Sequence, residues 1–246
     1  MSRFLVGATW SDVPHLTLEA QESLWASIPP YQRDARSKGI PQLGAGAIYP
    51  LPESDIRVQD FAIPPHWPRG FGMDVGGGAK PTAAAWFTQD PATSTLYLYA
   101  CYKRSAVEPS INAAAIRAKG AWIPGVADAA ALIVTEHDAE QLVSVYRRLG
   151  LDLQLPDKAV EAGIQDVWEL LSTGRLKVFG SCVDWLAEFR MYRRDARGRI
   201  VKKNDHLMDG TRYFIRRRRW RVLKTGPEKP QVLVLDSAQD LGLDWM

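Results

Sequence analysis

Ten consecutive residues, F-G-M-D-V-G-G-G-A-K at positions 71–80, set the tightest limits on how this chain can fold. An apolar lead-in ends in one carboxylate, Asp74, and three glycines follow it directly. This order is typical of a strand whose exit turn carries almost no side-chain bulk, so a charged group can come very close to Asp74. A plain hairpin turn after a strand is the simpler alternative. A functional role for Asp74 is favoured because other acidic residues accompany it, at Asp128 and in the sequence N-D-H-L-M-D at positions 204–209.

Short strands separated by turn residues follow one another from residue 69 onward. The β-rich runs lie at residues 71–75, 82–88 and 95–102. Their connections are short, so these strands should be antiparallel neighbours. A helix is then expected at 109–119, and a strand at 123–127 that delivers Asp128 at its carboxyl end. Because a strand after a helical crossover tends to run parallel to its predecessor, Asp128 should lie beside Asp74 at one edge of the sheet.

Helices and strands alternate in the second half of the chain. The expected helices are 139–149, 160–171 and 183–192, and the expected strands are 151–155 and 175–179. Residues 190–203 indicate a hairpin that turns near 195–198. Asn204 then fits the N-cap of a helix that runs to about residue 218. This order predicts an α/β fold in which a mixed sheet is flanked by helices on both faces.

The chain divides by composition into two regions. Its 246 residues are 46% hydrophobic and include nine Trp, enough for one full-sized core. Residues 1–68 contain short apolar groups, prolines and glycines without a long periodic element, which indicates a linker or strap. Residues 69–246 are predicted to form the main domain.

The acidic residues at the ends of these elements indicate a metal site. Asp205 and Asp209 stand at i and i+4 on the predicted last helix, with His206 between them. Together with Asp74 and Asp128 they offer the oxygen ligands that Mg²⁺ or Mn²⁺ prefers, and two such ions can cleave a phosphodiester. Without metal the crowded carboxylates should repel one another, which raises some of their pKa values.

Plainer interpretations exist for the residues of the last helix. Asp205 fits a first-turn acid stabilised by free backbone amides and the helix dipole, whereas Asp209, one turn further in, should lack that compensation. His206 fits a capping or surface histidine.

A local excess of positive charge predicts contact with nucleic acid. The net charge is only +3, yet residues 190–224 carry 14 of the 31 basic residues and only three acids. The four arginines at residues 216–219 within it are often a solvated face, but beside a phosphodiester site such a run favours phosphate contacts. The candidates are Arg193, Arg194, Arg197, Arg199, Lys202, Lys203, Arg216 and Arg217. Two distant cysteines and the absence of a long apolar run predict a cytoplasmic protein without zinc, disulfides or membrane contact.

Three acidic motifs and several segments near the N-terminus resemble the large terminase subunit of tailed bacteriophages, in particular its C-terminal nuclease domain with a ribonuclease H-like fold. M-D-V-G-G at 73–77, V-A-D-A at 126–129 and N-D-H-L-M-D-G at 204–210 look like its acidic stations. Segments within residues 8–50 look like the connection between the family's ATPase motor and its nuclease. The resemblance implies that Asp74, Asp128 and Asp209 bind two Mg²⁺ or Mn²⁺ ions, with Asp205 and His206 beside them and Asp205 as a further candidate ligand.

By this resemblance the chain is a two-metal-ion endonuclease that cuts concatemeric viral DNA during genome packaging. The expected partners are double-stranded DNA, the terminase ATPase domain, the small terminase subunit and the portal protein, at the procapsid in the bacterial cytoplasm. Residues 76–80 do not match a P-loop, so the ATPase motor is expected to be absent, as in a fragment, a truncated prophage gene or a separate subunit. The alternatives are an actin-like or sugar-kinase-type phosphotransferase and a non-catalytic DNA-binding remnant.

Overall fold

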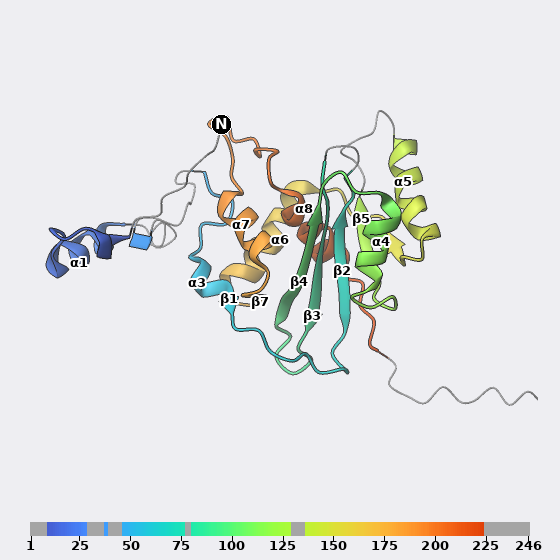
Figure 1. Cartoon of the computed structure of the whole chain (residues 1–246), viewed down its shortest axis with the longest axis horizontal. Helices are drawn as coiled ribbons and strands as arrows, with labels where there is room; N and C mark the ends of the chain where they lie inside the picture. Colours follow the sequence, from blue (N-terminus) through green and yellow to red (C-terminus); the bar gives the residue numbers. More distant parts are fainter. Residues whose placement is uncertain (1–8, 29–36, 39–45, 77–79, 129–135, 224–246) are drawn as a thin grey trace, which may run out of the picture.

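A mixed β-sheet forms the centre of the molecule (Figure 1). The computed structural model describes residues 9–28, 37–38, 46–76, 80–128 and 136–223. Within these ranges the sheet has seven strands in the order β1-β7-β4-β3-β2-β5-β6. Their bounds are β1 Arg57–Val58, β2 Arg69–Asp74, β3 Thr82–Gln89, β4 Leu96–Arg104, β5 Gly125–Asp128, β6 Leu153–Gln154 and β7 Leu176–Phe179.

The strand directions follow the prediction. Strands β2, β3 and β4 pair in antiparallel fashion, and β5, β6, β7 and β1 are added in parallel at the two sides. The short turns between β2, β3 and β4 force the chain to reverse, whereas the later strands return through helical crossovers. The predicted mixed sheet is therefore confirmed. Strand β1 was not predicted, because two residues carry no periodic signal.

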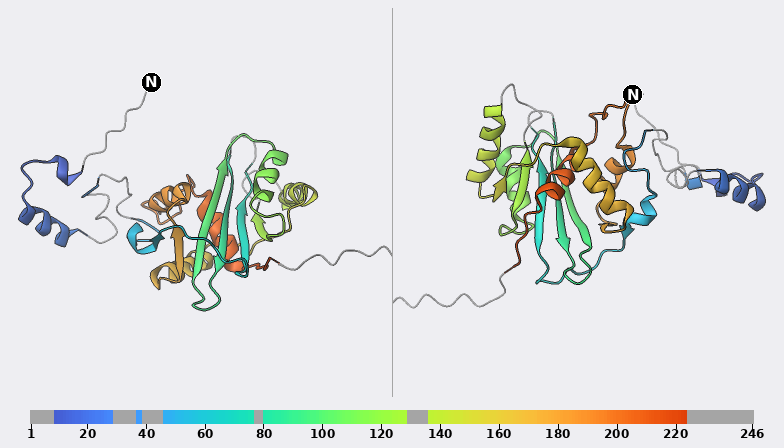
Figure 2. Two further views of the ribbon diagram at one scale, coloured as in Figure 1. Left: turned by 60° about the horizontal axis from the view of Figure 1, so that its bottom comes forward. Right: turned by 180° about the vertical axis from the view of Figure 1, so that it is seen from behind.

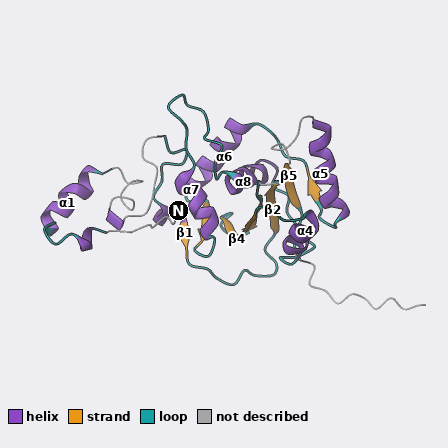
Figure 3. Ribbon diagram, turned by 45° about the horizontal axis from the view of Figure 1, so that its top comes forward, coloured by secondary structure: helices purple, strands orange, loops and turns teal. Residues whose placement is uncertain are grey.

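Helices cover both faces of the sheet (Figure 2). Helices α4 (Pro109–Arg117) and α5 (Glu136–Arg148) lie on one face. Helices α6 (Val160–Ser172), α7 (Val183–Met191) and α8 (His206–Arg217) lie on the other. Figure 3 shows α8 between the strands β2 and β5 and the helices α6 and α7. In the described ranges, no helix combines the length and the apolar character needed to cross a bilayer.

Strand β3 separates two apolar cores. Its residues alternate, so that Ala83, Ala85 and Phe87 face the α6–α7–α8 side while Ala84 and Trp86 face the α4–α5 side. All of them are buried. A strand covered on both faces has no polar side, which explains why this stretch is apolar throughout.

The residues before the sheet belong partly to this packed unit. The 3₁₀ helix η1 (Trp10–Asp12) and helix α1 (Leu18–Ser27) come first, and the hydroxyl of Thr17 accepts a capping hydrogen bond from the Ala20 amide at 3.2 Å. Further on, helix α3 (Glu53–Ile56) leads into β1, and Ile56 is completely buried in the core. The domain boundary after residue 68 stays a prediction, although core residues lie on both sides of it.

The connection between α7 and α8 contains the predicted turn. Arg194 and Ile200 form a single antiparallel bridge, and the Asp195 amide donates to the Arg199 carbonyl oxygen over 2.7 Å. Gly198 occupies the turn with a φ of 77°, a backbone conformation that favours glycine. The hairpin is shorter than predicted, because α7 continues through Met191 before the chain turns.

Candidate active site

Two buried aspartates end neighbouring parallel strands. Asp74 is the last residue of β2 and Asp128 the last of β5, and the strand register places them directly opposite each other. The Val75 amide donates to the Asp128 carbonyl oxygen over 2.8 Å, so the pairing continues past the two carboxylates. The predicted juxtaposition is confirmed, and its cause is that adjacent parallel strands bring their carboxyl ends to one edge.

Helix α8 can approach this edge because glycine faces glycine. A Cβ on Gly72 of β2 would lie 1.9 Å from the carbonyl oxygen of Gly210 in α8. With no side chain between them, the helix packs directly onto the strand that carries Asp74. The start of α8 therefore meets the ends of β2 and β5 around one cavity of about 740 Å³. All five predicted acidic and histidine site residues line it: Asp74, Asp128, Asp205, His206 and Asp209.

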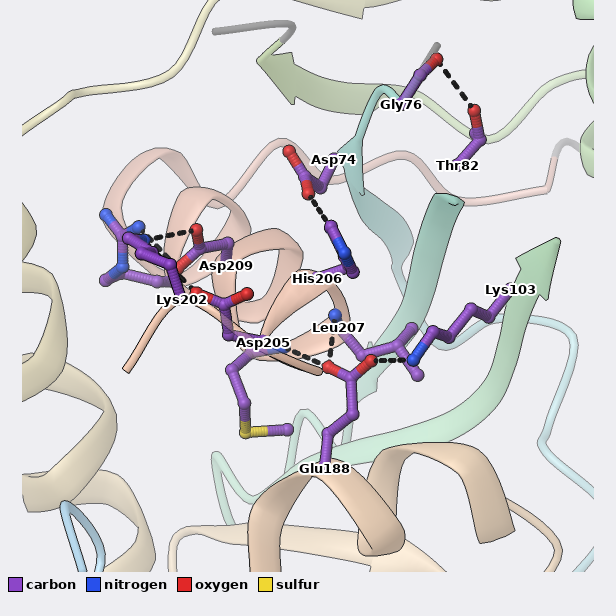
Figure 4. A network of polar contacts seen from close by, with 12 residues as sticks. Asp74, Gly76, Thr82, Lys103, Glu188, Lys202, Asp205, His206, Leu207 and Asp209 are labelled. Atoms are coloured by element: carbon purple, nitrogen blue, oxygen red, sulfur yellow. Dashed lines mark hydrogen bonds and ion pairs between the residues drawn. The ribbon is translucent and has the colours of Figure 1, made fainter. Parts of the chain in front are cut away.

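Asp74 and His206 form a hydrogen-bonded pair (Figure 4). The Nδ1–H of His206 donates to Asp74 Oδ2 over 2.7 Å. Burial raises the pKa of Asp74 to about 6, the hydrogen bond from His206 opposes this rise, and the charges of Asp209 and Asp205 add to it. The hydrogen bond to Asp74 in turn raises the pKa of His206. The predicted direction is confirmed for Asp74, with burial rather than carboxylate crowding as the largest cause.

Asp209 and Asp205 are bound by basic side chains. Asp209 Oδ1 accepts a hydrogen bond from Arg212 Nη2 at 2.7 Å, and the Arg212 side chain is only 2% exposed. The ammonium of Lys202 lies 3.2 Å from Oδ2 of both Asp205 and Asp209 (Figure 4). Burial works against the charge of Lys202, but Asp209 and Asp205 outweigh it and raise the pKa of that ammonium. Asp209 is expected to lack compensation by free backbone amides and the helix dipole, and two basic side chains compensate its charge in their place.

The first amides of α8 are held by Glu188 of α7 rather than by a local cap. Glu188 Oε2 accepts hydrogen bonds from the amides of Leu207 at 2.7 Å and Met208 at 3.4 Å, and its Oε1 accepts from Lys103 Nζ at 2.6 Å. Asp205 occupies the N-cap position, yet its side chain accepts no capping bond. The predictions that Asn204 caps this helix and that the amides stabilise Asp205 are therefore wrong. No sequence pattern identifies Glu188, because it lies 19 residues before Leu207.

The predicted DNA-contacting residues divide into paired and unpaired side chains. Arg194 pairs with Glu161, Arg199 with Asp195, Arg216 with Asp157 and Asp166, and Lys202 with the acidic site residues. In the part of the chain that the structure describes, no ion pair is formed by Arg193, Arg197, Lys203 or Arg217. Of the predicted set, only Lys202 and Lys203 line the cavity.

Three basic residues that line the cavity were missed. Arg212 stands at i+3 from Asp209, so helical spacing could have found it. Lys80 and Lys158 also line the cavity. Lys80 follows the glycine run in the sequence, whereas Lys158 has no distinguishing pattern among the many lysines.

The donor set fits a hard divalent cation, although the side chains do not yet converge on one point. Within the described ranges, no three His, Cys, Asp or Glu side chains are gathered closely enough to hold an ion as they lie. The reason is that Asp74, Asp205 and Asp209 each point to a basic partner. Asp205 Oδ2 is buried, and its contact with Lys202 lacks hydrogen-bond geometry. Carboxylates from three elements around one cavity are the ligands that Mg²⁺ and Mn²⁺ prefer.

The fold and the cavity at the sheet edge define a ribonuclease H-like domain. The solved structure of the P22 large terminase nuclease domain matches this chain with a TM-score of 0.66 at 31% identity, covering 73% of this chain and 96% of that one. A large terminase from a thermophilic bacteriophage shares the fold with a TM-score of 0.59 at 18% identity, over 84% of this chain and 53% of that one.

Sequence comparison gives the family. The model of the terminase RNase H-like domain matches residues 71–218, and the chain belongs to that family. The large terminase subunit of Salmonella phage P22 is 34% identical over 244 residues, which cover 94% of this chain and 47% of that protein. The large terminase subunit of Enterobacteria phage LP7 is 35% identical over 226 residues, which cover 86% of this chain and 46% of that protein. The chain thus spans about half the length of these relatives.

Proposed function

We propose that this chain is the metal-dependent DNA endonuclease part of a phage terminase large subunit, which cuts concatemeric viral DNA during genome packaging. The observation that carries the proposal is the direct opposition of Asp74 and Asp128 at the ends of β2 and β5, with Asp209 of α8 on the same cavity. Membership of the terminase family supports it. The same membership argues against the phosphotransferase alternative.

Two Mg²⁺ or Mn²⁺ ions are the proposed cofactors, held by Asp74, Asp128 and Asp209 with Asp205 as a further candidate. When bound, such ions activate water and stabilise the leaving 3′ oxygen of a phosphodiester. The chain itself orients the ligands: His206 fixes the carboxylate of Asp74, and Arg212 fixes one oxygen of Asp209. The buried floor of the cavity excludes bulk water from the carboxylates, which strengthens their attraction for a cation.

The proposed partners follow from the same role. Double-stranded DNA is the substrate, and the ATPase domain, the small terminase subunit and the portal protein are the proposed assembly partners at the procapsid in the bacterial cytoplasm. The two terminase relatives are about twice as long as the region that matches this chain. Their remaining length supports an ATPase domain as a partner of the matched region.

Plasmid cleavage and metal binding test the site together. Asp74→Asn and Asp128→Asn each remove a charge and keep the shape, so cleavage in Mg²⁺ or Mn²⁺ should fall by several orders of magnitude. Calorimetric titration with Mn²⁺ should show weaker binding in both variants. Asp184→Asn, an exposed aspartate on α7, is the matched control and should leave both quantities unchanged. Wild-type cleavage in either site variant would refute the site, and a wild-type chain that binds DNA without cutting it would favour the non-catalytic remnant.

The salt dependence of DNA binding tests the proposed phosphate contacts. Arg193 and Arg197 form no ion pair within the described ranges, whereas Arg194 and Arg199 are already paired with acids. Removing one phosphate-binding side chain should reduce the slope of log affinity against log salt by about 0.9. We expect a reduction by about 1.8 for the Arg193→Ala/Arg197→Ala variant and a smaller one for Arg194→Ala/Arg199→Ala. Unchanged slopes in both double variants would indicate that DNA binds on the side of Arg216 and Arg217 instead.

A further inference from the structure

Lys202 is placed where a cation would bridge two carboxylates of the site. Its ammonium lies at the same distance, 3.2 Å, from Asp205 Oδ2 and Asp209 Oδ2. In the described part of the chain, Asp205 forms its one ion pair with this lysine. Figure 4 shows the lysine side chain reaching the two aspartates from the segment before α8. A divalent ion shared by Asp205 and Asp209 would have to occupy the same space as this ammonium.

The two basic partners of Asp209 differ in how firmly they are held. Arg212 is 2% exposed, its guanidinium lies 4.9 Å from the centre of the Tyr213 ring, and a Cβ on Gly163 would come within 2.3 Å of its Cγ. This packing holds the stem of the Arg212 side chain in the interior. The Lys202 side chain is 61% exposed and belongs to the non-helical segment between the hairpin and α8. Lys202 can therefore move to solvent without disturbing the core, whereas the carboxylates that it leaves are only 7% and 12% exposed and need another cation in its place.

We propose that Lys202 is a displaceable counter-cation, which neutralises Asp205 and Asp209 while the site is free of divalent metal and moves out when metal binds. The inference rests on the proposed metal site. An ammonium and a divalent cation repel each other strongly at contact distance in a buried setting, so both cannot occupy the carboxylate pair. The lysine thereby stabilises the acidic cavity in the absence of metal. A metal ion binds only if its affinity for the carboxylates is high enough to displace the ammonium.

Calorimetric titration with Mn²⁺ and thermal unfolding of the full chain test this role without a cleavage assay. Lys202→Met removes the ammonium and keeps the stem, so the variant should bind Mn²⁺ roughly three- to tenfold more tightly, because Mn²⁺ no longer has to displace a solvent-accessible cation from the two carboxylates. Its melting temperature without metal should fall below that of the wild type, because Asp205 and Asp209 then repel each other. At saturating Mn²⁺ the two melting temperatures should agree.

Matched variants separate displacement from a general loss of positive charge. Lys203→Met and Lys158→Met also remove a cavity-lining charge, yet among the described residues neither lysine forms an ion pair with Asp205 or Asp209. Both should keep the wild-type Mn²⁺ affinity within about twofold, because both lysines are exposed and water and salt weaken their interaction with the carboxylates. Lys202→Arg keeps the charge and should stay close to the wild type.

Several results would overturn the proposal. An equal gain in affinity for Lys202→Met and Lys203→Met would reduce the effect to overall charge. Weaker Mn²⁺ binding in Lys202→Met would mean that the lysine supports the ion. If the wild type binds Mn²⁺ and Lys202→Met is unchanged, this inference alone fails, whereas the absence of Mn²⁺ binding in every variant rejects the proposed metal site together with it.

Discussion

Three buried carboxylates around α8 each have a counter-charge. Asp74 is paired with His206, Asp209 with Arg212, and Asp205 with Lys202. A site of this kind can fold without metal, because its negative charges are compensated inside the protein. Metal binding must then compete with these internal pairs. The basic partners differ in exposure, from 2% for the Arg212 side chain to 61% for that of Lys202, so a metal ion should not displace them equally easily.

The ranking of Asp209 and Asp205 can be tested by paired Asn substitutions. Burial dominates the raised pKa of Asp74, but the charge of Asp209 adds more to it than the charge of Asp205 does, which indicates the closer electrostatic link. We therefore expect Asp209→Asn to abolish metal-dependent cleavage, and Asp205→Asn to retain measurable activity. Asp209→Asn should also lower the free energy of unfolding by roughly 3 kcal/mol, because it leaves the buried Arg212 without its partner.

Cleavage assays at several Mn²⁺ concentrations, together with urea unfolding, measure both effects. The unfolding data separate loss of a ligand from loss of the fold. The reverse order of activities would make Asp205 the third metal ligand.

At the scale of elements, the position of helix α8 determines which side chains meet at the site. The helix lies on β2 through the contact of Gly72 with Gly210, and it is tied to α7 by Glu188 and by the hydrogen bond from Trp185 Nε1 to Thr211 Oγ1 at 2.8 Å. Helix α7 is linked back to β4 through the pair of Glu188 with Lys103. The position of the acidic residues of α8 therefore depends on contacts that lie outside their own helix.

Replacing Glu188 should loosen the start of α8. Glu188→Ala removes the acceptor of two helix amides and leaves Lys103, whose side chain is 23% exposed, without its partner. We expect the free energy of unfolding to fall by roughly 2–3 kcal/mol, with about 1 kcal/mol from the missing cap and the rest from the broken pair. Glu169→Ala, which removes a pair between the largely exposed Glu169 and Arg175, should cost less than about 1 kcal/mol.

Chemical unfolding followed by circular dichroism compares the two Glu→Ala variants. Equal destabilisation by both would show that Glu188 does not anchor α8.

At the scale of the whole molecule, residues before the predicted boundary complete the sheet. Strand β1 pairs with β7 at the edge, and Tyr49 packs in the core against Phe189 and Tyr192 with ring-centre distances of 6.3 and 5.6 Å. Glu53 forms an ion pair with Arg190 of α7 at 2.6 Å. These contacts join a segment that looked like a strap to the same core as the later helices.

Two truncations test where the folded unit begins. A chain that starts at residue 46 keeps Tyr49 and Ile56, and its melting temperature should stay close to that of the full chain. A chain that starts at residue 69 loses both core side chains, each of which contributes about 2–5 kcal/mol. Its melting temperature should fall on the order of 10 °C or more, or its unfolding should cease to be cooperative. Equal melting temperatures for the two chains in differential scanning calorimetry would instead support a boundary after residue 68.

The sequence alone determined the mixed sheet and the opposition of Asp74 and Asp128. Both follow from local patterns, since strand and helix periodicity, short turns and the parallel return after a crossover are written in neighbouring residues. Tertiary structure alone decided how the charges are compensated and how α8 is held. Glu188 and Lys103 act through partners far away in the sequence, Lys202 lies outside the helix to which a spacing rule applies, and β1 is too short to carry a pattern. Such pairings depend on which surfaces meet in space, and only the packed chain fixes that.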